Sequence, residues 1–227
     1  MSEKRASVYE TRPPRLKLVI AGASRSGTLF MQRLLEAGKP GLVGKSAVFT
    51  HALFAGAAER LNLDLWDIEV SDLAAPLLWM LPASVPVVHQ LRHPILSICS
   101  SAVNGGVRDE SIVPWSKRCP RIKDCEDELS AVAAVWLEFS KAIERRAVHA
   151  FKVEDMETAD QVQAILAIGG LRATAAIDGA FTSLGKSTNH WNDYELAQLA
   201  PALKRSPLWP EVAELGERYG YDMSCRS

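Results

Sequence analysis

Hydrophobic residues along the chain form short apolar runs that alternate with longer stretches of helical spacing. Residues 16–21, LKLVIA, are a mostly apolar run that is typical of a buried parallel strand. Residues 84–91 and 148–153 predict two further strands. Spacing of apolar residues at three and four positions predicts helices at residues 28–38, 52–61, 95–103, 126–146, 193–203 and 211–219. Thr158 and Gln161 form a capping box that starts one more helix, which Gly169 stops.

Strands that alternate with helices predict an α/β fold, a three-layer sandwich with a central, mainly parallel sheet. We expect residues 1–15 to be a flexible arm and residues 16–227 to form one domain. Residues 104–126 are polar and rich in turn formers, and a loop of this length is a lid, a binding loop or a disordered segment.

The loop after the first strand, GASRSGT from Gly22 to Thr28, has the layout of a phosphate cradle. Its glycines let backbone N–H groups approach an anion, and Arg25 supplies a cation. A nucleotide hydrolase would carry lysine where Thr28 stands and a metal-binding hydroxyl where Leu29 stands. The pattern therefore predicts a phosphate or sulfate site without magnesium. It also fits a plain strand–turn–helix corner with a solvated arginine.

A second anion site is predicted where the strand at residues 84–91 ends. Arg92 follows that strand, and Ser97 and Ser100 lie nearly one turn apart on the next helix. Ligands of open α/β sheets bind at the carboxyl ends of strands, so Arg92 should emerge beside the Arg25 loop. The alternative is that Arg92 caps a helix or pairs with Glu154.

Composition and charge limit the kinds of partner. The 227 residues have a net charge of −1, which gives no basic field for nucleic acid. The first 15 residues have no apolar core like that of a secretory signal, and no run reaches the length of a membrane span. The four cysteines lack the spacing of a zinc site. We expect a cytoplasmic protein with reduced thiols and no metal.

Five segments together resemble the sulfotransferase family that uses 3′-phosphoadenosine 5′-phosphosulfate (PAPS). ASRSGTLF is similar to the family's 5′-phosphosulfate loop, and LRHPILSICS to its 3′-phosphate segment. AFKVEDM, NHWNDYELAQLAP and ELGERYGYDM resemble later parts of bacterial members. The resemblance spans residues 16–222 in the same order. Two departures are Leu29 in place of a threonine and the absence of a late Arg-Lys-Gly triplet.

The resemblance implies roles for particular residues. Arg25 would contact the sulfo group, and Arg92 and Ser100 would hold the 3′-phosphate. The residues implied in donor binding are Ser24, Arg25, Ser26, Gly27, Thr28, Arg92, Ser100, Lys186 and Asn189. His51 is the expected base for the acceptor, although it also fits a residue that caps or lines a helix.

The implied reaction moves a sulfuryl group from PAPS to a hydroxyl or amine of a small-molecule or carbohydrate acceptor, and releases 3′-phosphoadenosine 5′-phosphate (PAP). Two other functions stay open: a P-loop-type kinase and a non-catalytic nucleotide-binding module. The sequence gives no indication of the acceptor's identity or of the oligomeric state.

Overall fold

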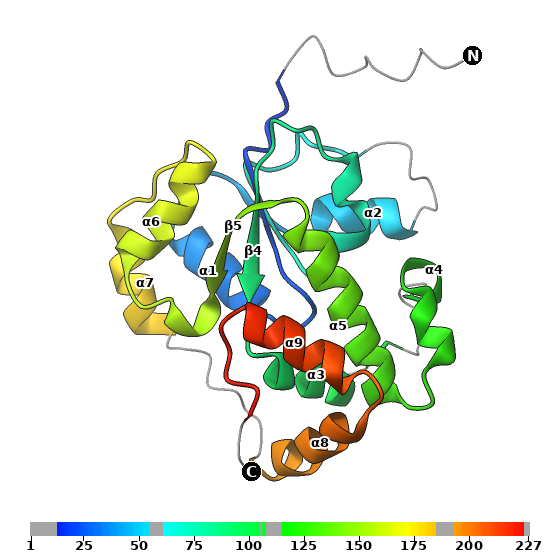
Figure 1. Ribbon diagram of the computed structural model, residues 1–227. Coiled ribbons are helices and arrows are strands. Elements are labelled where there is room, and N and C mark those ends of the chain that lie inside the picture. Colours follow the sequence, from blue (N-terminus) through cyan, green and yellow to red (C-terminus); the bar gives the residue numbers. More distant parts are fainter. Residues whose placement is uncertain (1–12, 55–60, 105, 108–114, 185–192, 225–227) are drawn as a thin grey trace, which may run out of the picture.

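The computed structural model describes residues 13–54, 61–104, 106–107, 115–184 and 193–224. Its centre is a sheet of five strands in the order β2-β3-β1-β4-β5, and every described pairing is parallel (Figure 1). The strands are β1 (Leu18–Ala21), β2 (Val43–Lys45), β3 (Ile68–Ser71), β4 (Val87–Leu91) and β5 (Ala147–Lys152). All five carboxyl ends therefore meet at one edge of the sheet.

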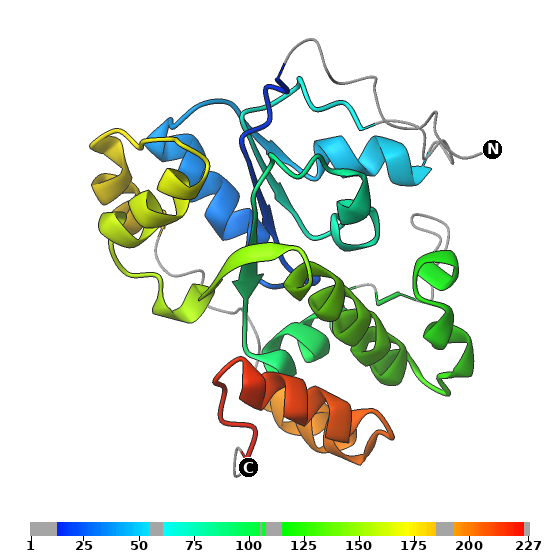
Figure 2. The same ribbon diagram turned by 45° about the horizontal axis from the view of Figure 1, so that its top comes forward.

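Helices cover both faces of the sheet. The α-helices are α1 (Thr28–Gly38), α2 (Ala47–Phe54), α3 (Pro94–Val103), α4 (Trp115–Arg118), α5 (Glu128–Glu144), α6 (Ala159–Ile168), α7 (Ala176–Leu184), α8 (Asp193–Arg205) and α9 (Trp209–Arg218). Three 3₁₀ segments, η1 (Ala75–Met80), η2 (Pro120–Asp124) and η3 (Val153–Asp155), complete the described elements. Figure 2 shows α1, α6 and α7 on one side of the strands and α5 with α2 on the other.

Alternation along β1 creates two hydrophobic cores. Leu18 and Ile20 point to one face and pack with α1, α6 and α7, whereas Val19 and Ala21 point to the other face and pack with α3, α5 and α9. Because β1 is buried on both faces, its run is apolar throughout. The predicted three-layer α/β sandwich is confirmed, and its described sheet is wholly parallel.

Local sequence features explain several helix ends. The Thr158 hydroxyl accepts a hydrogen bond from the N–H of Gln161, and the Gln161 side-chain oxygen accepts one from the N–H of Thr158, which confirms the predicted capping box. Pro94 occupies the first turn of α3, where its missing N–H costs nothing. α1 ends at Gly38, as predicted.

Other predictions of secondary structure were wrong. The helix predicted to start at residue 52 starts earlier, since α2 spans Ala47–Phe54, and most of the rest of the predicted range, residues 55–60, lies outside the described residues. The reason for the earlier start is Ser46, whose φ of 54° turns the chain and whose carbonyl accepts the Thr50 hydroxyl. β2 and β3 were not predicted at all. The polar stretch at 104–126 carries α4 and η2 in its described part.

The N-terminal segment is joined to the fold at Arg15, and the described cysteines are reduced. Residues 1–12 of the predicted arm lie outside the described residues. Arg15, at the end of that arm, forms an ion pair with Asp67, with 3.2 Å between Arg15 Nη2 and Asp67 Oδ2. Cys99, Cys119 and Cys125 are free thiols. None of the described helices is both long enough and apolar enough to cross a membrane.

Candidate anion-binding site

The loop between β1 and α1 has a backbone that glycine makes possible. Gly27, the N-cap of α1, has φ of 91°, and Arg25 has φ of 63°. A Cβ on Gly22 would lie 2.0 Å from Ser26 Oγ and 2.8 Å from the carbonyl oxygen of Gln90. Only glycine therefore fits at Gly22, and the loop turns tightly enough to direct the first N–H groups of α1 toward its own concave side.

The inside of this loop has unused hydrogen-bonding capacity. Ser26 is 2% exposed, and its Oγ has no partner among the described residues. The Gln90 side chain donates to the carbonyl of Ser26 at 2.8 Å, which fixes the loop on β4. A buried hydroxyl beside a helix N-terminus suits an anion with acceptor oxygens, so these residues fit the 5′-phosphate of a nucleotide.

Two arginines that follow different strands, Arg25 after β1 and Arg92 after β4, meet at this edge of the sheet. Arg92, directly after β4, donates from Nη1 to the carbonyl of Arg25 at 2.7 Å. Arg25 Nε in turn donates to Ser100 Oγ on α3 at 3.0 Å. Ser101 on the same helix donates to Ser24 Oγ at 3.2 Å. The structure thus brings Ser24, Arg25, Arg92 and Ser100 into one hydrogen-bonded cluster, although 67 residues separate the two arginines.

Burial and neighbouring charges act on Arg92 in opposite directions. Burial lowers the pKa of Arg92, the negative charge of Glu154 raises it, and the positive charge of Arg25 lowers it. Glu154 lies in η3, just beyond β5, and one of its oxygens accepts the N–H of His93 at 2.8 Å. The half-buried cation therefore depends on a fixed carboxylate, and it would gain from an anionic ligand.

Three predicted site residues cannot be compared with this cluster. Lys186 and Asn189 lie outside the described residues. His51 is in α2, but its side chain lies outside the description. His89, inside β4, is 2% exposed, and burial lowers its pKa to about 4.

A carboxylate that the sequence patterns did not indicate lies at the same edge of the sheet. Asp72 follows β3, the other neighbour of β1, and the backbone N–H of Gly22 donates to the carbonyl of Ser71 at 3.0 Å. Ser46 Oγ donates to Asp72 Oδ1 at 3.0 Å and lies 3.2 Å from Ser71 Oγ. An acidic residue directly after a strand would have identified Asp72, had β3 been recognised.

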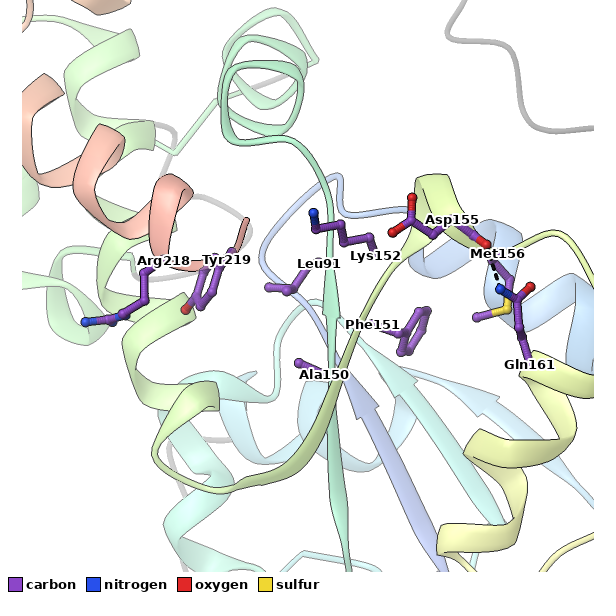
Figure 3. Close-up of a pocket in the computed structure, with 9 residues that line it drawn as sticks. All are labelled: Leu91, Ala150, Phe151, Lys152, Asp155, Met156, Gln161, Arg218 and Tyr219. Carbon is purple, nitrogen blue, oxygen red and sulfur yellow. Dashed lines mark hydrogen bonds between the residues drawn. The ribbon is translucent and has the colours of Figure 1, made fainter. Parts of the chain in front are cut away.

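A cavity of about 420 Å³ lies beside this cluster, along the outer edge of β5 (Figure 3). Arg218 and Tyr219 lie on one side of β5, and Met156 and Gln161 lie on the other. None of the predicted site residues whose side chains the structure describes lines this cavity. In the part of the chain that the structure describes, no three His, Cys, Asp or Glu side chains gather as a group that could hold a metal ion.

No protein-family model matches the chain, and no curated protein sequence matches it. Among solved structures, the chain is similar to the sulfotransferase domain of the olefin synthase from Synechococcus PCC 7002, with a TM-score of 0.52. The similarity covers 94% of this chain and 98% of that domain, at 13% sequence identity. The chain has the fold of a sulfotransferase domain. At this identity the shared fold leaves the chemistry to be argued from the site residues.

Proposed function

We propose that this chain is a sulfotransferase that moves a sulfuryl group from PAPS to a hydroxyl or amine of a small-molecule or carbohydrate acceptor. The observation that carries the proposal is the cluster of Arg25, Ser100 and Arg92 at the carboxyl ends of β1 and β4. Two cations within one network suit a ligand with anionic groups at two positions. The fold shared with a solved sulfotransferase domain supports the proposal.

Each part of the cluster has a role toward the donor in this proposal. Ser26 Oγ and the first N–H groups of α1 hold the 5′-phosphate, since they are donors with no competing partner in the described loop. Arg92 and Ser100 hold the 3′-phosphate. Lys186 and Asn189 belong to the proposal as residues that close over the nucleotide.

Bound PAPS supplies the sulfuryl group, whose S–O bond to the 5′-phosphate breaks as a bond to the acceptor forms, which leaves PAP. In this proposal, Arg25 stabilises the negative charge that develops on the oxygen between phosphorus and sulfur. A sulfuryl group carries less charge than a phosphoryl group, so an arginine can meet this need where a kinase uses magnesium. The acceptor loses a proton, and a base must take it.

Two residues are candidates for this base. His51 is the candidate from the sequence, because an imidazole has a suitable ordinary pKa. Asp72 is the candidate from the geometry, because it lies at the carboxyl end of β3 beside the loop and its Oδ1 is fixed by Ser46. The hydrogen bond from the N–H of Gly22 to the carbonyl of Ser71 joins the end of β3 to the start of the loop, so Asp72 directly follows a strand end that contacts the loop.

Calorimetric titration with three nucleotides tests the proposal. PAP should bind, adenosine 5′-phosphate should bind more weakly because it lacks the 3′-phosphate, and ATP with magnesium should show no advantage over ATP alone. Arg92→Ala should reduce PAP affinity to that of adenosine 5′-phosphate, a loss of about 1.5–3 kcal/mol. Magnesium-dependent binding of ATP without binding of PAP would establish the kinase alternative.

A transfer assay separates an enzyme from a non-catalytic module. PAPS is incubated with the protein and a panel of alcohols, phenols, sugars and amines, and release of PAP together with the sulfated product is measured. Stoichiometric appearance of both supports a sulfotransferase. Tight PAP binding without turnover on any acceptor, unchanged in His51→Ala and Asp72→Asn, would support the binding module.

A further inference from the structure

The C-terminal turn after α9 lies against the candidate site. Gly220 has φ of 76°, and the N–H of Tyr221 reaches back to the carbonyl of Gly216 at 3.0 Å. This is a Schellman end, and it directs the chain back across the end of β4 (Figure 1). Met223 is 3% exposed and packs against Gly216, so the turn is anchored in the core.

Tyr221 makes contacts with the segments that follow β4 and β5. Its hydroxyl donates to Glu154 Oε2 at 3.1 Å. Its ring packs edge-on against His93, with centroids 5.2 Å apart, and Lys152 Nζ lies 4.5 Å from the ring centroid. Lys152 also donates to the carbonyl of Gly220 at 2.6 Å, so the turn and β5 are joined twice.

Glu154 connects this turn to the anion site. Its Oε1 accepts the N–H of His93, the N-cap of α3, and its Oε2 accepts the Tyr221 hydroxyl. Both oxygens are therefore held in fixed directions. Arg92, next to His93 in the chain, has this carboxylate as the neighbouring negative charge. A carboxylate that lost the Tyr221 hydroxyl could turn toward the positive charge of Arg92, with which it interacts electrostatically, and would then compete with a phosphate for that guanidinium.

We infer that Tyr221 is a positioning residue for the 3′-phosphate: its hydrogen bond holds Glu154 in the orientation that lets Arg92 bind an anion. This inference rests on the proposed function. Tyr221 acts through Glu154 and does not itself contact the donor. The 3′-phosphate part of the site is therefore built from the last turn of the fold as well as from the segments around β4.

The test compares PAP with adenosine 5′-phosphate, because these two ligands differ only in the 3′-phosphate. Tyr221→Phe keeps the ring contacts and removes the hydroxyl. We expect it to weaken PAP binding by about tenfold, the effect of one hydrogen bond to a charged group, with adenosine 5′-phosphate unchanged. In turnover, the KM for PAPS should rise with kcat within about twofold.

Tyr219→Phe is the matched control, because Tyr219 packs against His89 and Trp136 and has no described contact with Glu154. It should leave the affinities for both ligands unchanged. Glu154→Gln in the presence and absence of Tyr221→Phe gives a double-mutant cycle, and the two losses should not add.

The outcomes distinguish this inference from the proposed function. If the wild-type protein binds PAP no more tightly than adenosine 5′-phosphate, the proposed function is wrong. If it prefers PAP but Tyr221→Phe weakens both ligands equally, or weakens neither, the inference is wrong and the turn has only a structural role. Additive losses in the cycle would also contradict it. Because the cycle compares the same substitution in two backgrounds, a change in folding that is common to both backgrounds cancels.

Discussion

Arg25 and Ser100 are hydrogen-bonded to one another at 3.0 Å, although 75 residues separate them. Arg25 belongs to the loop after β1 and Ser100 to the helix after β4, so the contact joins the two segments that the sequence assigned to opposite ends of one ligand. Arg92 donates to the carbonyl of Arg25 from the other side. A ligand that binds here must therefore engage both segments together, which makes the effects of substitutions in them interdependent.

Arg25→Ala should reduce turnover by about 100-fold or more, which is the usual effect of losing a donor that stabilises transition-state charge. PAP affinity should fall by a much smaller factor, since PAP lacks the sulfo group. Arg25→Lys should restore part of the rate because it keeps the charge but not the guanidinium geometry. Initial rates of PAP formation measure this effect. Wild-type turnover in Arg25→Ala would contradict the proposed role.

Ser100→Ala should weaken PAP binding by about tenfold, because a buried donor at the 3′-phosphate is lost. Ser97→Ala is the matched control on the same helix. Ser97 is 1% exposed, and its Oγ has no partner among the described residues, so its removal should leave PAP affinity unchanged and the fold at least as stable. Calorimetry on both variants checks the prediction. Equal losses in the two would show that α3 has only a packing role.

Gly27→Ala should destabilise the fold by about 1–2 kcal/mol, because a residue with a Cβ is strained at φ of 91°. The added Cβ would also lie 3.1 Å from the Gln90 side chain and from Val153. Gly179→Ala in α7 is the control: it has no atom within 4 Å of the added Cβ and should stabilise by about 0.5–1 kcal/mol. Urea denaturation of both variants measures whether each substitution lowers or raises the free energy of unfolding. A stable Gly27→Ala protein would show that the loop relaxes to another conformation.

Asp72→Asn and His51→Ala identify the base. The asparagine can still accept the Ser46 hydroxyl, so the local structure should persist while basicity is lost. If Asp72 is the base, kcat should fall by about 100- to 10,000-fold in Asp72→Asn, and PAP affinity should stay within about twofold. His51→Ala should then change kcat little. The reverse ranking would assign the role to His51.

Glu69 should make stability depend on pH. It is buried in β3, and burial raises the pKa of Glu69 from 4.5 to about 8 although the N–H of Val48 lowers it. The folded chain thus holds a proton that the unfolded chain releases between these values. The stability from this group is complete below pH 4.5 and is lost as the pH rises through about 8.

Glu69→Gln can accept the same Val48 hydrogen bond and cannot ionise. The free energy of unfolding of this variant, relative to the wild type, should therefore increase as the pH rises, and at high pH the variant should be the more stable protein. Urea denaturation of both proteins across this pH range measures the difference. A difference that stays constant with pH would mean that Glu69 does not keep its proton in the folded state.

Local sequence patterns were sufficient for much of this fold. The apolar run of β1, the glycines of the loop, the capping box at Thr158 and the proline at the start of α3 act within a few residues of one another, so a single sequence reveals them. β2 and β3 were missed because they are three and four residues long and because Gly44 and Glu69 interrupt their apolar character. Glu69 is buried in β3, where Val48 from α2 donates a hydrogen bond to it, a contact that the sequence of β3 does not indicate.

The candidate site was predictable where it depends on strand ends, and not where it depends on tertiary contacts. Ligands of open α/β sheets bind at the carboxyl ends of the strands, and this rule predicted that Arg92 lies beside the Arg25 loop. Asp72 was missed together with its strand. The hydrogen bond from Tyr221 to Glu154 spans 67 residues, and no pattern near either residue indicates it. Such contacts depend on how α9 packs, which a single sequence does not reveal.

The central position of β1 also affects how the chain can fold as it is made. β1 leaves the ribosome before the strands that pair with it, because its neighbours β3 and β4 end about 50 and 70 residues later. At typical rates of synthesis, roughly 3–10 seconds pass before the first neighbour is available, and during this time an apolar strand has two open edges. Protection of the nascent segment by a chaperone, and a slow refolding rate set by these distant pairings, are the expected consequences.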